Sequence, residues 1–140
     1  MAQSLTETFL QAFGRTGKSA NEYSGLDLAY IGDAVYDLVI RTLVLSEGNA
    51  PVNKLHHRVS GIVKAEAQKD SLHRIEELLT EEEQAVYRRG RNANAHTTAK
   101  NASVGDYRIA TGFEALIGYL YLKGETDRML ELIRAGLPED

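Results

Sequence analysis

Cysteine is absent from the 140-residue chain, so the protein forms no disulfide and cannot bind a metal through thiolates. This absence fits a reducing compartment, and the N-terminus lacks the basic-then-apolar pattern of a secretion signal. We therefore expect a cytoplasmic protein. A zinc site is not expected either, because His56 and His57 are adjacent and point in different directions on a helix, and no His-Glu-x-x-His pattern occurs.

An uninterrupted apolar run is also missing. The long apolar stretch over residues 26–45 contains Asp27, Asp33, Asp37 and Arg41. Each of these charges would cost about 2.5–3.5 kcal/mol near the centre of a bilayer, so a membrane span is excluded. Neither an internal repeat nor a β-hairpin signal is found. The helical spacing of apolar residues instead predicts an all-α protein, organised as one domain over residues 1–140.

The chain offers clear start and stop signals for helices. Residues 1–24 are interpreted as an amphipathic helix followed by a linker. The segment 14–19 superficially resembles a phosphate-binding loop, but it is assigned to the linker because the full motif spacing and a preceding strand are missing. Thr80 and Glu83 form a capping-box pattern, and a break is expected near residues 69–71. The predicted helices cover residues 26–45, 51–63, 65–79, 80–92 and 103–122, and a final helix ends at Gly136. The helix over residues 26–45 is expected to be the central, mostly buried helix of the domain. Leu78 is expected to face inward, and Ser103 with Asp106 gives another capping-box-like start.

Two of these apolar helices carry acidic side chains at positions where burial of a charged carboxylate is energetically unfavourable. Asp33 and Asp37 lie one turn apart on the first helix. Glu114 is the only charge between Arg108 and Lys123 on the second. A carboxylate in a core must be protonated, hydrogen-bonded or neutralised by a cation. Asp33 therefore either caps a neighbouring helix, pairs with an arginine, or holds a metal ion.

The two acids can share one cation if their helices cross. Small residues on both helices would allow the backbones to approach closely, namely Gly32, Ala34, Gly112, Ala115 and Gly118. The sequence thus permits, without requiring, a metal site between the two helices.

Positive charge gathers in one segment of an otherwise acidic chain. The formal net charge is −4, which argues against nucleic-acid binding by the whole surface. Between Tyr87 and Tyr107, however, the chain has four basic residues and only one acidic residue, Asp106. Such a local excess of positive charge indicates a partner-binding region. Residues 93–103 have no hydrophobic period and are expected to form a flexible basic loop, either a surface connection or an arm that orders on RNA.

Three stretches resemble the ribonuclease III family: residues 28–36, residues 88–93 and residues 113–122. The family pattern acid-x-x-x-Asp falls on Ala29 and Asp33, and its Asp-x-x-Glu pattern falls on Thr111 and Glu114. The replacement of two acids by alanine and threonine resembles the Mini-ribonuclease III branch, which consists of the nuclease domain alone. The resemblance implies the helical bundle of the ribonuclease III endonuclease domain.

The resemblance also implies a function. It implies a homodimeric, Mg²⁺-dependent endoribonuclease, with Mn²⁺ as a substitute, that cuts double-stranded RNA and matures the ends of 23S ribosomal RNA precursors. A ribosomal protein that presents the substrate is a further partner it allows. Asp33 and Glu114 would be catalytic metal ligands, and Thr111 would orient a metal-bound water. The expected RNA contacts are Arg88, Arg89, Arg91, Asn92, Lys100, Asn101 and Arg108.

Two other functions are considered. A catalytically silent factor that binds duplex RNA or assists ribosome assembly would arise through the loss of two of the four family acids, but Asp33 and Glu114 are retained. A helical protein-interaction module without RNA would leave both acids and the arginine cluster unexplained.

Overall fold

The computed structural model describes residues 3–93 and 103–139, and these contain helices and turns without any strand. The predicted all-α class is therefore confirmed. Within these residues, none of the helices is both long and apolar enough to cross a membrane. The α-helices are α1 (Leu5–Ala12), α2 (Gly25–Ser46), α3 (Val52–Val63), α4 (Ala65–Ile75), α5 (Glu81–Arg91), α6 (Val104–Lys123) and α7 (Thr126–Gly136), with short 3-10 turns η1 (Ala20–Glu22) and η2 (Glu76–Leu78).

Local capping chemistry sets the ends of the helices. The Ser24, Thr80 and Ser103 hydroxyls accept hydrogen bonds from backbone N–H groups in the first turns of α2, α5 and α6. The predicted capping box of Thr80 and Glu83 is confirmed, since the Glu83 side chain also accepts a bond from the Thr80 N–H. Gly124 adopts a positive φ of 81° and ends α6.

The predicted break near residues 69–71 is wrong. Helix α4 runs through them without interruption, and the chain breaks instead at Lys64, whose ψ of 156° is extended. The reason is that Gln68, Leu72 and Ile75 form one continuous buried face. Leu78 was expected to face inward but is 52% exposed, because the short turn η2 changes the chain direction after Ile75.

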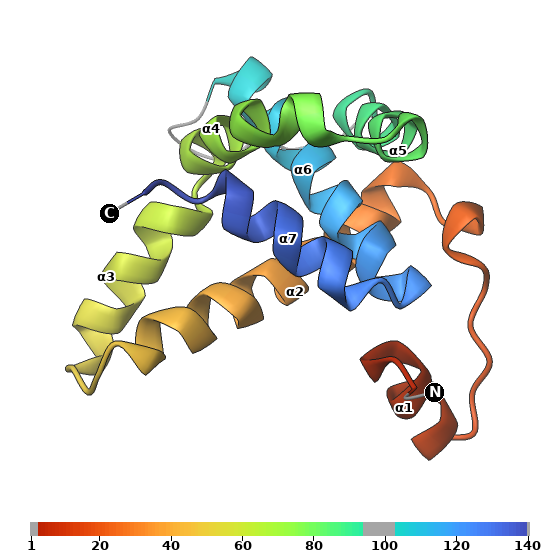
Figure 1. The fold of residues 1–140 in the computed structure, drawn as a ribbon, viewed down its shortest axis with the longest axis horizontal. Coiled ribbons are helices and arrows are strands. Elements are labelled where there is room, and N and C mark those ends of the chain that lie inside the picture. The colour runs from red at the N-terminus through yellow and green to blue at the C-terminus, as the bar shows by residue number, and fades with distance from the viewer. Residues whose placement is uncertain (1–2, 94–102, 140) are drawn as a thin grey trace.

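Helix α6 is the central element. It packs against α2, α4, α5 and α7, which surround it in Figure 1. Of the eleven positions from Ala110 to Leu120, all but Glu114 are buried. The sequence suggested that the helix over residues 26–45 would fill this place, and this is wrong. Helix α2 buries a single stripe and leaves Tyr30 and Leu38 exposed, because only one of its sides contacts α6.

Glycines allow α2 and α6 to touch backbone to backbone. A Cβ atom added at Gly32 would lie 1.8 Å from the Glu114 carbonyl oxygen, and one added at Gly118 would lie 2.0 Å from the Leu28 carbonyl oxygen. Gly112 has the same role toward α5, where Tyr87 lies against it. Ala34, also expected at the crossing, is exposed and does not take part in it.

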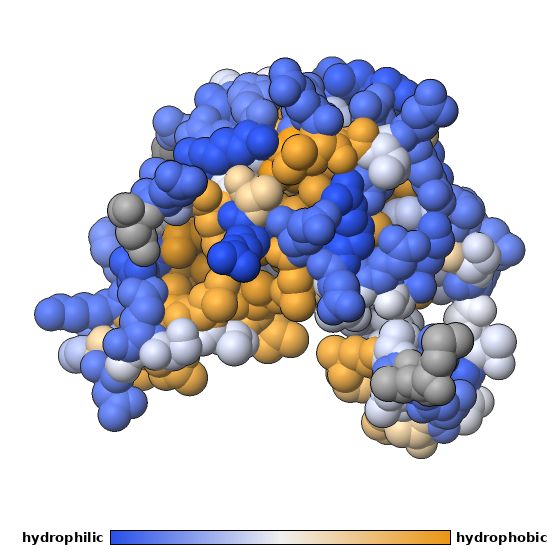
Figure 2. Space-filling view, viewed as in Figure 1, coloured by the Kyte–Doolittle hydropathy of each residue, from blue (hydrophilic) through white to orange (hydrophobic). Residues whose placement is uncertain are grey.

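Helix α1 stands at the edge of the fold. In Figure 1 it lies apart from the main body, and the chain reaches it through a long extended segment. The Thr6 Oγ1 donates a hydrogen bond of 2.8 Å to the Tyr121 carbonyl oxygen, which ties α1 to the end of α6. An apolar groove of about 530 Å³ separates α1 from α2 and α7, and apolar side chains face each other across it in Figure 2. We call this feature the α1–α2 groove.

The glycine contact yields a stability prediction. Gly32→Ala should lower the free energy of unfolding by more than about 2 kcal/mol, because the new Cβ must push the two backbones apart. The matched control is Gly61→Ala in α3, where an added Cβ meets nothing within 4 Å and should stabilise by about 0.5–1 kcal/mol. Urea unfolding followed by circular dichroism measures both. Equal stabilities would contradict the close contact.

Candidate active site

The two predicted metal ligands meet where α2 crosses α6. Gly32 lies against the backbone carbonyl of Glu114, which brings Asp33, the next residue of α2, beside the Glu114 side chain. The two carboxyl groups are close enough to form a hydrogen bond when one of them holds a proton. Residues 81 positions apart in the chain are thus joined in one acid pair.

The two acids differ in their exposure. Both were expected to be buried, and this is wrong for Asp33, which is exposed, whereas Glu114 is half-buried. Helical geometry explains the difference. Gly32 faces α6, and each residue advances about 100° around the helix, so Asp33 lies at the rim of the contact. In the acid pair, Glu114 is therefore partly enclosed by the protein, whereas Asp33 is accessible to solvent and ligands.

Glu114 binds its proton unusually tightly. Burial, and after it the neighbouring Asp33 carboxylate, raise the pKa of Glu114 to about 8. The Gln68 side chain opposes this shift, since its Nε2 donates a hydrogen bond of 3.4 Å to the Glu114 Oε2. At neutral pH most molecules without a bound cation hold a proton on Glu114. A cation between the two carboxylates would take the place of this proton.

The other open interpretations of the first acidic helix are settled by its neighbours. Asp33 caps no helix and forms no ion pair within residues 3–93 and 103–139. Asp37, one turn later, pairs with Arg41 at 2.7 Å. The two aspartates on this face therefore have different partners. Asp37 is neutralised by Arg41 of the same helix, whereas Asp33 faces Glu114.

The two positions where the family pattern has further acids are closed to solvent. Ala29 and Thr111 are each 7% exposed. The Thr111 Oγ1 donates a hydrogen bond of 2.9 Å to the Tyr107 carbonyl oxygen, and its lone pairs remain able to accept one. In the described part of the chain, no cluster of three or more His, Asp or Glu side chains suited to a metal occurs. A cation here would take two protein carboxylates, a donor set that suits Mg²⁺ with several retained waters.

The predicted RNA contacts fall into three groups. Arg88, Arg91 and Asn92 lie at the end of α5, and Arg108 is exposed on α6. Arg89 is engaged with the protein itself, since its guanidinium donates to the Tyr23 carbonyl oxygen. Lys100 and Asn101, like most of the predicted loop over residues 93–103, lie outside the described residues.

The end of α5 is held beside the acid-bearing part of α6. A Cβ at Gly90 would lie 3.1 Å from the Thr111 carbonyl oxygen and 3.0 Å from the Gly112 Cα. The Arg91 guanidinium lies 5.5 Å from the centre of the Tyr87 ring and bonds to the Asn92 side chain. The C-terminal end of α5 thus packs against the α6 backbone two to three residues before Glu114.

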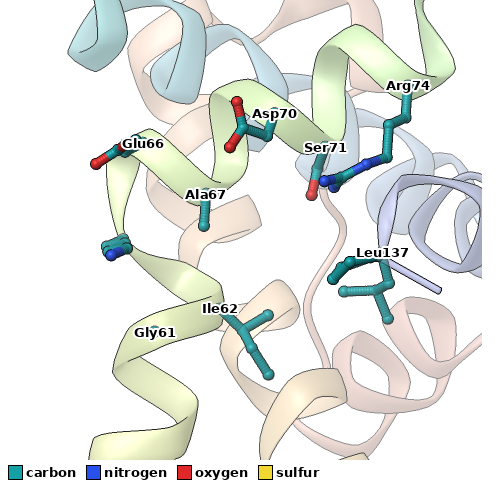
Figure 3. Close-up of a pocket in the computed structure, with 10 residues that line it drawn as sticks. Gly61, Ile62, Glu66, Ala67, Asp70, Ser71, Arg74 and Leu137 are labelled. Carbon is teal, nitrogen blue, oxygen red and sulfur yellow. The ribbon is translucent and has the colours of Figure 1, made fainter. Parts of the chain in front are cut away.

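A separate polar hollow of about 250 Å³ lies between the α3–α4 junction and the C-terminal segment. Figure 3 shows Arg74 reaching from α4 toward Leu137, and its Nη1 donates a bond of 2.7 Å to the Gly136 carbonyl oxygen. None of the predicted site residues lines this hollow. Its arginine fastens the C-terminal segment to α4.

Sequence reasoning missed Gln68. This residue is 1% exposed and contacts Glu114. A signal was present, because Gln68 shares the i, i+4, i+7 face with Leu72 and Ile75, which are both fully buried. A polar side chain on such a face must have a partner inside the protein.

Comparison with known proteins identifies the family of this chain. A model of the Ribonuclease III domain matches residues 26–125. A Mini-ribonuclease 3 of Thermoanaerobacter sp. is 54% identical over 110 residues, which cover 79% of this chain and 78% of that protein. A Mini-ribonuclease 3 of Clostridium tetani is 48% identical over 120 residues, covering 85% and 80%. The crystal structure of a Fusobacterium nucleatum protein matches with a TM-score of 0.77 at 33% identity, covering 84% of this chain and 96% of that one.

Together the fold and these matches define an endoribonuclease with the helical fold of the ribonuclease III domain. The chain belongs to the ribonuclease III family and, within it, to the Mini-ribonuclease 3 proteins.

The raised pKa of Glu114 leads to a prediction about stability and pH. The folded protein keeps a proton up to about pH 8 that the unfolded chain loses near its ordinary value, so the free energy of unfolding should fall as pH rises through this window. Glu114→Gln removes the titrating group. Its stability relative to the native protein should therefore increase from pH 5 to pH 8.5 in the presence of a chelator.

Urea unfolding at several pH values measures this difference. Glu66→Gln, at an exposed position of α4, is the matched control and should show a constant difference. A constant difference for Glu114→Gln as well would contradict the proton-sharing acid pair.

Proposed function

We propose that this endoribonuclease cuts double-stranded RNA with Mg²⁺ held between Asp33 and Glu114, and that Mn²⁺ can substitute. The observation that supports the proposal is the acid pair itself. Two carboxyl groups on crossing helices lie within hydrogen-bonding reach of each other, and burial together with the Asp33 carboxylate raises the pKa of Glu114 to about 8. Such a pair is unfavourable with both charges present and no cation, so a divalent cation is the ligand that best fits it.

The chemistry follows from the residues. When bound, a divalent cation supplies an activated water and neutralises charge on the leaving oxygen of a phosphodiester. Asp33, at the exposed rim, would bind on the side open to the RNA, and Glu114 on the side toward the core. Thr111 would orient a water molecule through its free lone pairs, although a hydroxyl supplies no negative charge. The products would carry 5′-phosphates.

The RNA path proposed here begins at the basic end of α5. Duplex RNA is recognised mainly through its shape, phosphates and 2′-hydroxyls. Arg88 and Arg91 lie at the end of α5, which packs beside Thr111, and Arg108 is exposed on the preceding turn of α6. We propose these three as phosphate contacts, with Asn92, Lys100 and Asn101 as further contacts. Arg89 would contribute by fixing the linker at Tyr23 and by its charge.

A homodimer is part of the proposal. The α1–α2 groove is lined almost entirely by apolar side chains, and Leu38, Leu43 and Phe9 are 57%, 45% and 50% exposed. An apolar surface of this kind is typical of an interface between proteins. Two subunits would present two acid pairs to one duplex, so that the sites cut opposite strands and leave short 3′ overhangs.

The biological substrate is proposed from the family resemblance. We infer a cytoplasmic enzyme, with residues 1–140 as one catalytic domain, that trims the ends of 23S ribosomal RNA precursors, with a ribosomal protein as a partner that presents them. The alternative is a silent factor that binds duplex RNA or assists ribosome assembly. It is favoured by one observation, the burial of Ala29 and Thr111 where the family pattern has acids.

The central prediction concerns Asp33→Asn. The purified protein should convert long double-stranded RNA into discrete fragments with 5′-phosphates in millimolar Mg²⁺, and a chelator should stop the reaction. Asp33→Asn should lower the cleavage rate by at least about 10³-fold, because a metal-holding charge is lost. The fold and the RNA affinity should persist.

Asp37→Asn is the matched control, since Asp37 lies one turn away and pairs with Arg41, and it should keep most of the activity. Paired cuts on opposite strands would support the dimer. Binding without cutting by the native protein, on long duplexes and on the ribosomal precursor within its particle alike, would favour the silent factor.

A further prediction concerns salt. In the inactive Asp33→Asn background, Arg91→Ala and Arg108→Ala should each weaken RNA binding and reduce the slope of log affinity against log salt by about 1, because one phosphate contact is lost. Lys100→Ala should act in the same way. Arg134→Ala, on the exposed surface of α7, is the control and should leave the slope unchanged. Equal slopes for all variants would place the RNA elsewhere.

A further inference from the structure

One buried polar contact reaches the acid pair from outside the two acidic helices. Gln68 lies on α4 and is 1% exposed, and its Nε2 donates a hydrogen bond of 3.4 Å to the Glu114 Oε2. It shares its helix face with Leu72 and Ile75, which are both fully buried. A buried amide is unfavourable unless it is hydrogen-bonded, and an apolar residue would fill the same space without that requirement.

The helix that carries Gln68 is also held to α6 by an ion pair next to this contact. Lys69, the next residue, pairs with Asp106 at 3.5 Å near the start of α6. Gln68 itself is 1% exposed, so close packing around its side chain limits how far the amide can turn away from Glu114.

The choice of an amide has a chemical consequence. A lysine or arginine at this position would neutralise Glu114 and compete with any cation for its oxygens. A leucine would leave the carboxylate free to rotate. An amide N–H orients the carboxylate through Oε2 while leaving its full negative charge and its second oxygen for another ligand.

We propose that Gln68 is a positioning residue that holds the Glu114 carboxylate in the orientation in which it binds a divalent cation together with Asp33. The inference rests on the proposed function, because it assigns Gln68 to the metal site of the nuclease. Residues that hydrogen-bond to metal ligands fix their orientation, and their loss typically weakens metal affinity or activity by 10–100-fold.

The experiment uses two substitutions that remove the contact in different ways. Gln68→Met keeps the length of the side chain but has no donor. Gln68→Asn keeps the amide but is one methylene too short to span the 3.4 Å contact. The matched control is Ser71→Ala, which removes a buried polar group from the same face of α4 without touching Glu114. Asp33→Asn serves as the reference for a lost ligand.

The first readout needs no RNA. Mn²⁺ binding to each full-length protein is titrated by electron paramagnetic resonance of the free ion. We expect at least a tenfold weaker Mn²⁺ affinity for Gln68→Met and Gln68→Asn, and an affinity close to that of the native protein for Ser71→Ala. Affinities of both Gln68 variants equal to the native value would overturn the proposal.

The second readout separates positioning from folding and from RNA binding. Both Gln68 variants should need about tenfold more Mg²⁺ for half-maximal cleavage and should recover much of their rate at high Mg²⁺, with unchanged RNA affinity. A rate that excess Mg²⁺ does not restore, or the unfolding of both variants by circular dichroism, would overturn the proposal. If Mn²⁺ binding depends on Gln68 but the native protein cuts no RNA, the proposed function fails while the positioning role stands.

Discussion

The backbone contact between α2 and α6 is the constraint on which the rest of the structure depends. Gly32 and Gly118 each place one helix against a carbonyl oxygen of the other, and no side chain could be inserted between them. Around this point the larger residues complete the packing, as in the edge-to-face contact of Tyr36 with Phe113, whose ring centres are 5.2 Å apart. The crossing fixes where every other residue of both helices lies, including the two acids.

The crossing also determines the electrostatics of the site. It brings Asp33 and Glu114 together at the edge of the core, where burial and like charge oppose ionisation of Glu114. Asp37, one turn along the same helix, is paired with Arg41 and therefore adds no unpaired negative charge to the acid pair. The result is an acid pair that no ion pair neutralises within residues 3–93 and 103–139, and its Glu114 lies on the helix against which the end of α5 packs. Under the proposed function, a chain with a net negative charge would in this way present both a cation site and a surface for RNA phosphates.

Some of the fold could be predicted from the sequence because it rests on interactions between near neighbours. The Thr80–Glu83 capping box, the serine cap at Ser103 and the end of the last helix at Gly136 all involve residues within a few positions of one another. The predicted break at residues 69–71 failed because Lys69 and Asp70 lie toward the outer side of α4, whereas the inner face continues through Gln68, Ser71 and Leu72. Local polarity alone does not show which side of a helix the core will cover.

The sequence by itself determined the all-α class, the family and the identity of the two acids, since these depend on helical periodicity and on motifs contained in single segments. Only the tertiary structure decided that Asp33 is exposed while Glu114 is half-buried, that Arg89 binds the Tyr23 carbonyl, and that Gln68 contacts the site. These features join residues that lie 46 to 81 positions apart. Their distances depend on how closely and at what angle the helices cross, and that geometry arises from the packing of all the helices around α6 rather than from any one segment.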